Sequence, residues 1–379
     1  MDYRLTEDQE SIRELAEKFA KEVCAPEAEI IEKEHRFPIE TFRKMAELGL
    51  YAVNFSEEYG GIGKDALAEI LVVEELSKAC LSHAAAFQIN RACAGMIDKF
   101  GSAEQKEKYL PWMIENGIPG SVCITESGAG SDAASMRTMA VRDGDDWILN
   151  GTKCFITGAG ISELYIVCAQ TDRALGAKGI TLFIVDPSTP GFSIGKIENK
   201  MGLVGSQTGE VILEDVRVPG ANLLGEVGKG FKYIMADLDA ARIGTAAQGL
   251  GTAEAALEQA IKYSGERVQF GRPINKFQGI QWYLAEMATK VESAKWMIYH
   301  AAWMKNEGLP FGKEAAMAKL YGTTIGREVV NTALQIHGGY GYMKDYPLER
   351  MYRDVRITEI YEGTSEIQKV VIANHLIKG

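Results

Sequence analysis

The spacing of apolar residues changes along the chain. From Thr6 to about residue 117, apolar positions recur every three or four residues, as in "LTEDQESIRELAEKFAKEV" and "DALAEILVVEELSKAC", which is typical of amphipathic helices. From about Ser121 the spacing becomes two, in "ELYIVCAQTD" and "GEVILEDVRVP", with Asp-Gly, Asn-Gly and Pro turn signals between such segments. The first third is therefore predicted to be a helical layer, and the next to be an antiparallel β domain.

After "GKGF" the helical spacing returns in three long stretches, at roughly 231–263, 277–306 and 312–336. Helices of this length suit a bundle that also packs against other subunits. The order α, β, α contains no alternating βαβ units, which argues against a Rossmann sheet. A nominal dinucleotide fingerprint at 61–66 follows "SEEY" instead of a strand, so we give it little weight.

These changes divide the chain into three expected domains. We predict an α+β protein with an N-terminal helical domain over 1–120, a central β domain over 121–230 and a C-terminal helical domain over 231–379.

Composition and charge narrow the possible partners. The 379 residues carry 41 Lys and Arg against 52 Asp and Glu, a formal charge of -11, which disfavours nucleic acid and anionic lipid as partners. The six cysteines are scattered, with no CxxC pair and no His at ligand spacing, so we expect buried thiols and no metal site. The N-terminus lacks the features of a signal peptide, and no run of about 18 apolar residues occurs, so we expect a cytoplasmic protein without membrane insertion.

Two strand ends carry small and hydroxyl residues. "VCITESGAGSD" (122–132) lets backbone N–H groups and the side chains of Thr125 and Ser131 approach a ligand closely. "CFITG" (154–158) places an aromatic and a hydroxyl at the end of the next strand, where it would wall the same pocket. The alternatives are an ordinary β-to-β loop for the first segment and a buried strand end for the second.

Two loops beside long helices are rich in basic residues or glycine. "GERVQFGRPINKFQ" (265–278) crowds Arg267, Arg272 and Lys276 around Phe270, which suits a pyrophosphate next to a flat heterocycle. "QIHGGYGYMKDYP" (335–347) would bring backbone amides against a ligand. The alternatives are a solvated basic loop and a helix C-cap, in which His337 is a satisfied buried imidazole.

Near the C-terminus, "TEIYEGTSEIQKV" places Glu362 and Gly363 between two helical segments. Ser365 and Gln368 match a capping box, so a new helix is expected to start there. At such a joint some N–H groups lack helical partners, and a carboxylate can project into a cavity and act as a base. The alternative is a solvated surface glutamate.

Taken together, "LTEDQ", "EEYGG", "ITESGAGSD", "CFITG", "RVQFGRPI", "QIHGGYGY" and "IYEGTSEIQ" resemble the acyl-CoA dehydrogenase family over essentially the whole chain, and its short-chain, butyryl-CoA dehydrogenase-like members in particular. The resemblance implies a barrel-like central β domain, a C-terminal four-helix bundle, one FAD per subunit and a homotetramer. It also implies an acyl-CoA substrate and electron exchange with an electron-transferring flavoprotein.

The resemblance assigns roles residue by residue. Glu362 would take the α-proton while the β-hydride passes to flavin N5, with the Glu362 amide and a ribityl hydroxyl binding the thioester carbonyl. FAD would be held by Val122, Ile124, Thr125, Ser131, Phe155, Ile156, Thr157, Arg267, Phe270, Gln278, Thr364 and Glu366, and by Gln335, Gly338 and Gly339 of the adjoining subunit. The CoA thioester would contact Ser131, Asp239, Arg242 and Gly363. For Asp239 and Arg242, an i,i+3 ion pair is the alternative.

The sequence departs from the family pattern at three positions. Phe155 stands where Trp is usual, and Ser127 where Pro is usual, so the aromatic contact is kept but the rigidity of the loop is in question. Arg91 lies in the segment that walls the acyl chain, and we expect it to bind a polar or anionic acyl terminus, because an unpaired buried guanidinium is costly. The alternative is that Arg91 pairs with an acid or reaches the surface.

The direction of the reaction stays open, since the same residues serve an acyl-CoA dehydrogenase and an enoyl-CoA reductase for a polar, aryl or carboxylated acyl group. An acyl-CoA oxidase or a non-catalytic acyl-CoA-binding subunit is a weaker alternative.

Overall fold

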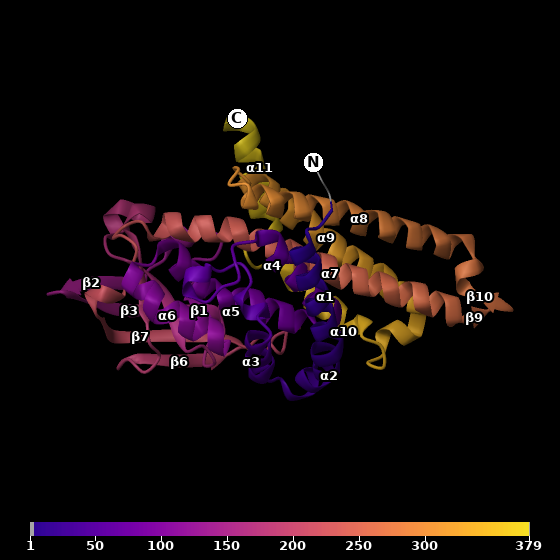
Figure 1. Cartoon of the computed structure of the whole chain (residues 1–379), viewed down its shortest axis with the longest axis horizontal. Coiled ribbons are helices and arrows are strands. Elements are labelled where there is room, and N and C mark those ends of the chain that lie inside the picture. Colours follow the sequence, from indigo (N-terminus) through magenta and orange to yellow (C-terminus); the bar gives the residue numbers. More distant parts are fainter. Residues whose placement is uncertain (1–3, 379) are drawn as a thin grey trace.

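The computed structural model describes residues 4–378, and its elements follow the predicted order of helices, strands and helices (Figure 1). The N-terminal helices are α1 (Glu7–Phe19), α2 (Ala25–Glu34), α3 (Ile39–Glu47), α4 (Ala66–Ala79), α5 (Leu81–Phe100) and α6 (Ala103–Asn116). A π-helical turn at Ala20–Cys24 joins α1 to α2. The caps are set locally: Thr6 with Gln9 and Ser102 with Gln105 form capping boxes, and Asp65 caps α4.

Eight of the strands form one sheet. They are β1 (Gly120–Cys123), β2 (Met139–Asp143), β3 (Asp146–Thr157), β4 (Leu164–Gln170), β5 (Ile180–Val185), β6 (Phe192–Ile197), β7 (Thr208–Val218) and β8 (Leu223–Leu224). The sheet order is β6-β7-β3-β2-β4-β5-β8, with β1 beside β4. The prediction of an antiparallel domain holds for most pairs, but β4 pairs in parallel with β1 and, at one residue pair, with β2. Period-two spacing reports the buried face of a strand and carries no information on strand direction.

The C-terminal part consists of long helices. They are α7 (Gly230–Glu266), α8 (Gln278–Asn306) and α9 (Gly312–His337), followed by α10 (Leu348–Val355) and α11 (Ser365–Lys378). A two-stranded hairpin of β9 (Val268–Gln269) and β10 (Arg272–Pro273) joins α7 to α8 at the end of the molecule opposite the sheet (Figure 1). The long helices α7, α8 and α9 pack against one another, and the shorter α11 packs against α9, which together form the C-terminal helical domain.

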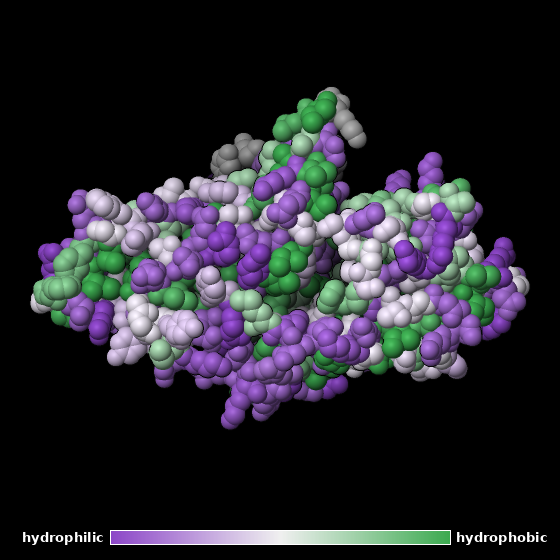
Figure 2. Space-filling view, turned by 180° about the vertical axis from the view of Figure 1, so that it is seen from behind, coloured by the Kyte–Doolittle hydropathy of each residue, from purple (hydrophilic) through white to green (hydrophobic). Residues whose placement is uncertain are grey.

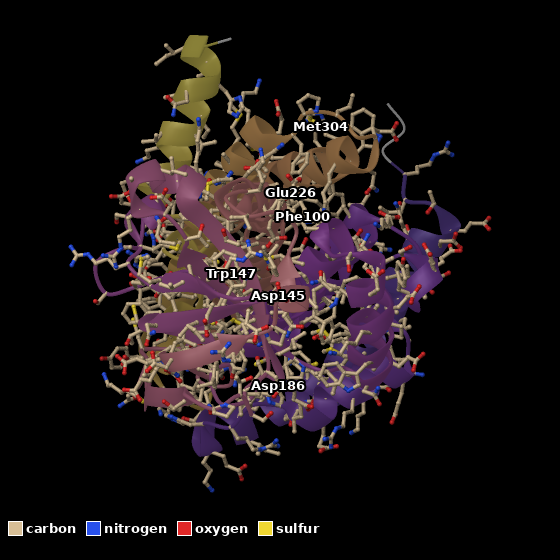
Figure 3. All side chains as sticks on the ribbon, turned by 90° about the vertical axis from the view of Figure 1, so that its left-hand side faces the viewer. Phe100, Asp145, Trp147, Asp186, Glu226 and Met304 are labelled. Atoms are coloured by element: carbon tan, nitrogen blue, oxygen red, sulfur yellow. The ribbon has the colours of Figure 1, made fainter. Side chains whose placement is uncertain are left out.

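The N-terminal helices share core residues with both other parts. One apolar core joins them to α7, α8 and α9, and a second joins α5 and α6 to the sheet. Figure 3 looks onto the sheet end, where Trp147 is labelled; this side chain packs against Phe183 at a ring distance of 5.4 Å. The shared cores hold the sheet, α5 and α7 in one arrangement, and this arrangement forms the site.

Helix α11 projects from the body (Figure 1), and Figure 2 shows hydrophobic side chains gathered on it. They include the exposed residues Val370, Leu376 and Ile377. All six cysteines are buried and unpaired, as expected. Over residues 4–378, no helix is long and apolar enough to cross a membrane, and no group of three or more His, Cys, Asp or Glu could hold a metal ion.

Helices α7 and α9 cross at close range, and this crossing depends on glycine. A Cβ on Gly249 would lie 2.6 Å from the Gly322 carbonyl oxygen, and one on Gly326 would lie 2.9 Å from that of Gly249. We expect Gly249→Ala to separate the two helices and to lower the free energy of unfolding by roughly 1–3 kcal/mol, measured as a fall in the denaturation midpoint of the FAD-loaded protein.

Gly265→Ala is the control in the same helix. Its Cβ would meet only the Asn275 Nδ2 atom at 3.5 Å, so the substitution should be neutral or stabilising by up to about 1 kcal/mol. Equal destabilisation by both variants would show that the crossing does not depend on the close contact at Gly249.

Candidate active site

Glu362 lies at the joint between the turn that follows α10 and the first residue of α11. Its φ is 53° and that of Gly363 is 91°, so both residues adopt the left-handed conformation. Glycine takes this conformation freely, whereas a glutamate pays backbone strain that is usually found where a side chain must be aimed. The N–H group of Glu362 donates to no other group among residues 4–378. The joint therefore presents a carboxylate and an unused donor together.

Two buried side chains hold this joint in place. The Lys319 ammonium, fully buried on α9, donates to the Tyr361 carbonyl at 2.9 Å and to the Gly363 carbonyl. The Gln368 amide donates to the Gly363 carbonyl at 2.8 Å and to the Glu362 carbonyl at 3.3 Å. These hydrogen bonds tie the backbone carbonyls of the joint to α9 and α11.

The helix start differs from the expected capping box. Thr364 caps α11, because its hydroxyl accepts from the Ile367 N–H at 3.3 Å, whereas the Ser365 hydroxyl donates to the Glu359 carbonyl. Gln368 was expected to bond back to the cap and instead bonds to the joint. The left-handed residues before the helix move the cap by one position, which a spacing rule does not capture.

The surroundings of Glu362 favour its protonated form. Burial and the nearby Asp237 carboxylate raise the pKa of Glu362 to about 7, against the opposing effects of Lys319 and Arg242. Burial lowers the pKa of Lys319 to about 8. A carboxyl group with a pKa near neutrality exchanges protons readily at physiological pH.

Glu126 and Lys153 organise the "TESGAGSD" loop. The Glu126 carboxylate accepts from the N–H groups of Arg137 and Thr138 and from the Thr138 hydroxyl. The fully buried Lys153 ammonium donates to Glu126 at 2.9 Å and to the Ile124 carbonyl at 3.1 Å. These bonds hold the glycine-rich loop in place. They supply the rigidity that the loop could otherwise lose because Ser127 stands where proline is usual.

A β-bulge directs Phe155 away from the sheet. The register of β3 against β7 shifts between Lys153 and Ile156, and Phe155 has a φ of 57°. As a result, the Phe155 side chain is 64% exposed although it lies within a strand. An exposed aromatic ring of this kind often marks a binding site, and a flat cofactor ring could stack on it.

One cavity of about 1270 Å³ unites most of the predicted site. The following predicted residues line it: Arg91, Val122, Ile124, Thr125, Ser131, Phe155, Ile156, Thr157, Arg242, Glu362, Gly363 and Thr364. Asp239 and Glu366 do not line it. Asp239 forms the i,i+3 ion pair with Arg242 that was the alternative reading, and Glu366 is exposed on α11.

Arg91 has partners within the protein. Its guanidinium donates to a Glu69 carboxylate oxygen at 2.9 Å, to the Tyr51 carbonyl at 3.1 Å and to the Val53 carbonyl, and it lies 4.5 Å from the centre of the Phe87 ring. Only 2% of the residue is exposed. The expectation of an anionic acyl terminus at Arg91 rested on an unpaired guanidinium, and the structure shows the alternative, pairing with an acid. Glu69 is far away in the sequence, so the sequence alone did not indicate it.

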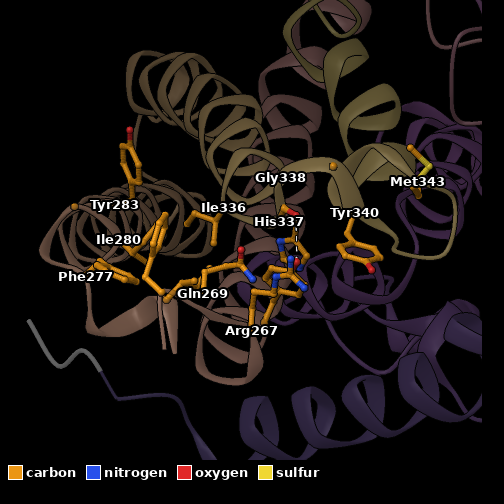
Figure 4. Close-up of a pocket in the computed structure, with 15 residues that line it drawn as sticks. Arg267, Gln269, Phe277, Ile280, Tyr283, Ile336, His337, Gly338, Tyr340 and Met343 are labelled. Atoms are coloured by element: carbon orange, nitrogen blue, oxygen red, sulfur yellow. Dashed lines mark hydrogen bonds between the residues drawn. The ribbon is translucent and has the colours of Figure 1, made fainter. Parts of the chain in front are cut away.

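The remaining predicted residues lie around a second cavity, of about 800 Å³, at the hairpin end (Figure 4). Arg267, Phe270, Gly338 and Gly339 line it. Gln278 and Gln335 do not line it, although the next residues, Gly279 and Ile336, do. Both sequence segments thus meet in one chain, whereas the sequence reading placed them on different subunits. Phe270 is 95% exposed, so little of the described chain packs against its ring.

Four supporting residues were missed from the sequence. They are Lys319, Gln368, Lys153 and Glu126. The first three bind the backbone of the site without lining its cavity, whereas Glu126 binds the loop backbone and also lines the cavity. A signal existed for Lys319, because it is a charged residue on the apolar face of a long predicted helix. The structure thus sets a carboxyl group of raised pKa in the same cavity as exposed aromatic and hydroxyl groups, which is suited to proton transfer beside a planar cofactor.

Comparison with known proteins agrees with a site for proton transfer beside a planar cofactor. Models of the acyl-CoA dehydrogenase N-terminal, middle and C-terminal domains match residues 6–117, 121–216 and 228–377. The chain is 51% identical over 380 residues to the acryloyl-CoA reductase (NADH) of Anaerotignum propionicum, covering 100% of this chain and 96% of that protein.

Two solved structures superpose over 100% of both chains. Butyryl-CoA dehydrogenase from Megasphaera elsdenii has a TM-score of 0.97 at 44% identity. A chain from a study of the electron transferring flavoprotein of Acidaminococcus fermentans has a TM-score of 0.98 at 48% identity. The chain belongs to the acyl-CoA dehydrogenase family. It is accordingly an FAD-dependent oxidoreductase that acts on CH–CH groups.

Replacing Lys319 tests the role of the buried ammonium. Lys319→Met removes two hydrogen bonds to the joint and a positive charge that lowers the pKa of Glu362. We expect a fall in kcat and an upward shift of the pH at which Glu362 ionises, measured from the pH profile of acyl-CoA-dependent flavin reduction. Lys313→Met, which removes an ion pair with Glu314 on the same helix, is the control. An unchanged pH profile in Lys319→Met would contradict this role.

Proposed function

We propose that this protein interconverts a saturated acyl-CoA and its 2,3-enoyl-CoA, with Glu362 as the acid–base group. The observation that carries the proposal is the Glu362 joint: a strained carboxylate with a pKa raised to about 7, in one cavity with the strand-end loops of the sheet. In the oxidative direction Glu362 removes the proton from the substrate α-carbon. In the reductive direction the protonated Glu362 returns it.

The strand-end loops would hold the flavin part of FAD. Two strand-end segments supply apolar, aromatic and hydroxyl groups to the same cavity, which Thr364 also lines. The residues are Val122, Ile124, Thr125 and Ser131 in the first segment and Phe155, Ile156 and Thr157 in the second. When bound, FAD supplies the hydride acceptor or donor, and the chain supplies position and electrostatics. The Glu126–Lys153 pair keeps the first loop in place for this contact.

The thioester would be bound by hydrogen-bond donors that have no acceptor among the described residues. The Glu362 N–H and the buried Arg242 Nε donate to no group of residues 4–378. We assign the Glu362 N–H to the thioester carbonyl, where it stabilises the negative charge that develops as the α-proton leaves; one such donor contributes about 10²–10³ in rate in comparable sites. Ser131, Arg242 and Gly363 would contact the CoA thioester, with Asp239 holding Arg242 through its ion pair.

The pH dependence follows from the pKa of Glu362. Because the base must be ionised to remove the α-proton, kcat/KM for acyl-CoA oxidation should rise with pH through about 7 and level off above it. Enoyl-CoA reduction needs the protonated group, so its rate should fall over the same range. The test is an anaerobic titration with acyl-CoAs, following the loss of the visible flavin band at several pH values.

Glu362→Gln is the control for this titration. The variant keeps FAD and the shape of the joint but cannot accept the proton, so its flavin should not bleach. Bleaching of the variant at the wild-type rate would exclude Glu362 as the base. A protein that cannot be reconstituted with FAD would overturn the whole proposal.

The second cavity supports an FAD site built from two subunits. Arg267, Phe270, Gly338 and Gly339 suit the pyrophosphate and adenosine, with Gln278, Gln335 and Glu366 as further predicted contacts. Arg242 and Arg267 lie 25 positions apart on or just after α7, about 37 Å at the rise of a helix, so one chain does not bring both cavities to one FAD. The exposed apolar residues of α8 and α11 suit the expected homotetramer.

Mixed subunits test this arrangement. Arg267→Glu and Glu362→Gln should each abolish activity in the pure variants. When the two are co-expressed, an Arg267→Glu subunit keeps its own Glu362 and receives Arg267 from its partner, so activity should return in part. No recovery in isolated mixed oligomers would mean that each chain completes its own FAD site.

The physiological direction and the electron partner are proposals from relatives. The acryloyl-CoA reductase of Anaerotignum propionicum favours enoyl-CoA reduction as the second candidate, and the Acidaminococcus fermentans neighbour favours exchange with an electron-transferring flavoprotein in the cytoplasm. Steady-state rates in both directions with a purified electron-transferring flavoprotein would decide between dehydrogenase and reductase.

A further inference from the structure

The main cavity extends into a gap between α4, α5 and α7. Small residues line the facing sides of this gap, Ala92 and Gly95 on α5 and Ala241 and Gly244 on α7. Apolar side chains of α4 also line it, but charged groups of α4, α5, α7 and α8 share the same wall. A purely aliphatic acyl chain would meet charge here.

Most of these charges neutralise one another in pairs. The three ion pairs of this wall are Arg91–Glu69 at 2.9 Å, Lys64–Asp98 at 3.0 Å and Lys99–Asp237 at 3.0 Å. The second oxygen of Glu69 accepts from the Asn54 amide at 2.6 Å, so both of its oxygens are used. Each carboxylate of the group therefore already has a cation.

Lys305 is the fourth cation of this wall and has no carboxylate of its own. It lies in the last turn of α8 and lines the cavity, and its ammonium forms no hydrogen bond or ion pair with any residue from 4 to 378. Glu69 and Asp237 act on Lys305 only at longer range, and burial lowers its pKa. This wall therefore has four cationic side chains and three carboxylates. The one excess positive charge is that of Lys305, which has no ion-pair partner among residues 4–378.

We propose that the acyl group of the substrate carries a carboxylate at its far end and that the Lys305 ammonium binds it. This inference rests on the proposed function, since it names the class of acyl-CoA that the same site accepts. An acyl carboxylate in the gap would complete the fourth pair. An unsubstituted chain that reaches Lys305 would strip water from the ammonium and offer no acceptor in return.

The test compares matched thioesters. Wild type and Lys305→Met are given saturated acyl-CoAs of increasing length, each with and without a terminal carboxylate, and kcat/KM is measured by anaerobic flavin bleaching. For the carboxylated series we expect a loss of roughly tenfold or more in Lys305→Met, with the unsubstituted series unchanged or improved. Lys290→Met, on the same helix outside the cavity and paired with Glu328, is the control and should behave as wild type.

Binding of non-reactive thioether analogues separates this inference from the proposed function. If no thioester bleaches the flavin but Lys305→Met still weakens only the carboxylated analogue, the proposed function fails and the carboxylate site stands. An unchanged preference in both measurements overturns the carboxylate site. An equal loss for both series that disappears with dephospho-CoA thioesters also overturns it, because the ammonium would then bind a CoA phosphate.

Discussion

The site depends on one buried ammonium, that of Lys319. It binds the carbonyls on both sides of Glu362, where the backbone takes the left-handed conformation at Glu362 and Gly363. Burying a lysine is costly unless it is fully bonded, so folding α9 against the joint fixes the turn at the same time. The direction of the Glu362 carboxylate and its unused N–H group follow from that fixed turn, whereas burial and Asp237 raise its pKa against the opposing charge of Lys319.

A buried lysine also supports the opposite wall of the cavity, which the strand-end loop forms. Lys153 is fully buried behind the "TESGAGSD" loop and binds the Ile124 carbonyl and the Glu126 carboxylate. Each wall thus has a lysine that never touches the ligand but decides where the ligand-binding groups lie. This leaves the cavity itself lined by exposed aromatic, hydroxyl and small residues that are free to contact a cofactor and a thioester.

The length of α7 relates the two cavities to each other. This helix carries Arg242 beside the Glu362 carboxylate and leads to Arg267 at the hairpin end, so the two cavities proposed to hold FAD lie apart in a single chain. The proposed oligomer would resolve this separation by bringing the hairpin end of one chain to the sheet of another. In that arrangement the exposed Phe270 and Phe155 rings would contact the same cofactor.

Much of the protein was determined by the sequence itself. Apolar spacing predicted the order of the layers and the three long helices, because side chains at a given period must share a face. Most of the residues that the ordered motifs indicated line the main cavity. The contacts between distant segments were decided only by the tertiary structure. Arg91 meets Glu69, Lys319 meets the Glu362 joint, β1 runs parallel to β4 and Lys305 is left without a carboxylate, since partner choice depends on how helices and strands pack and no local pattern records it.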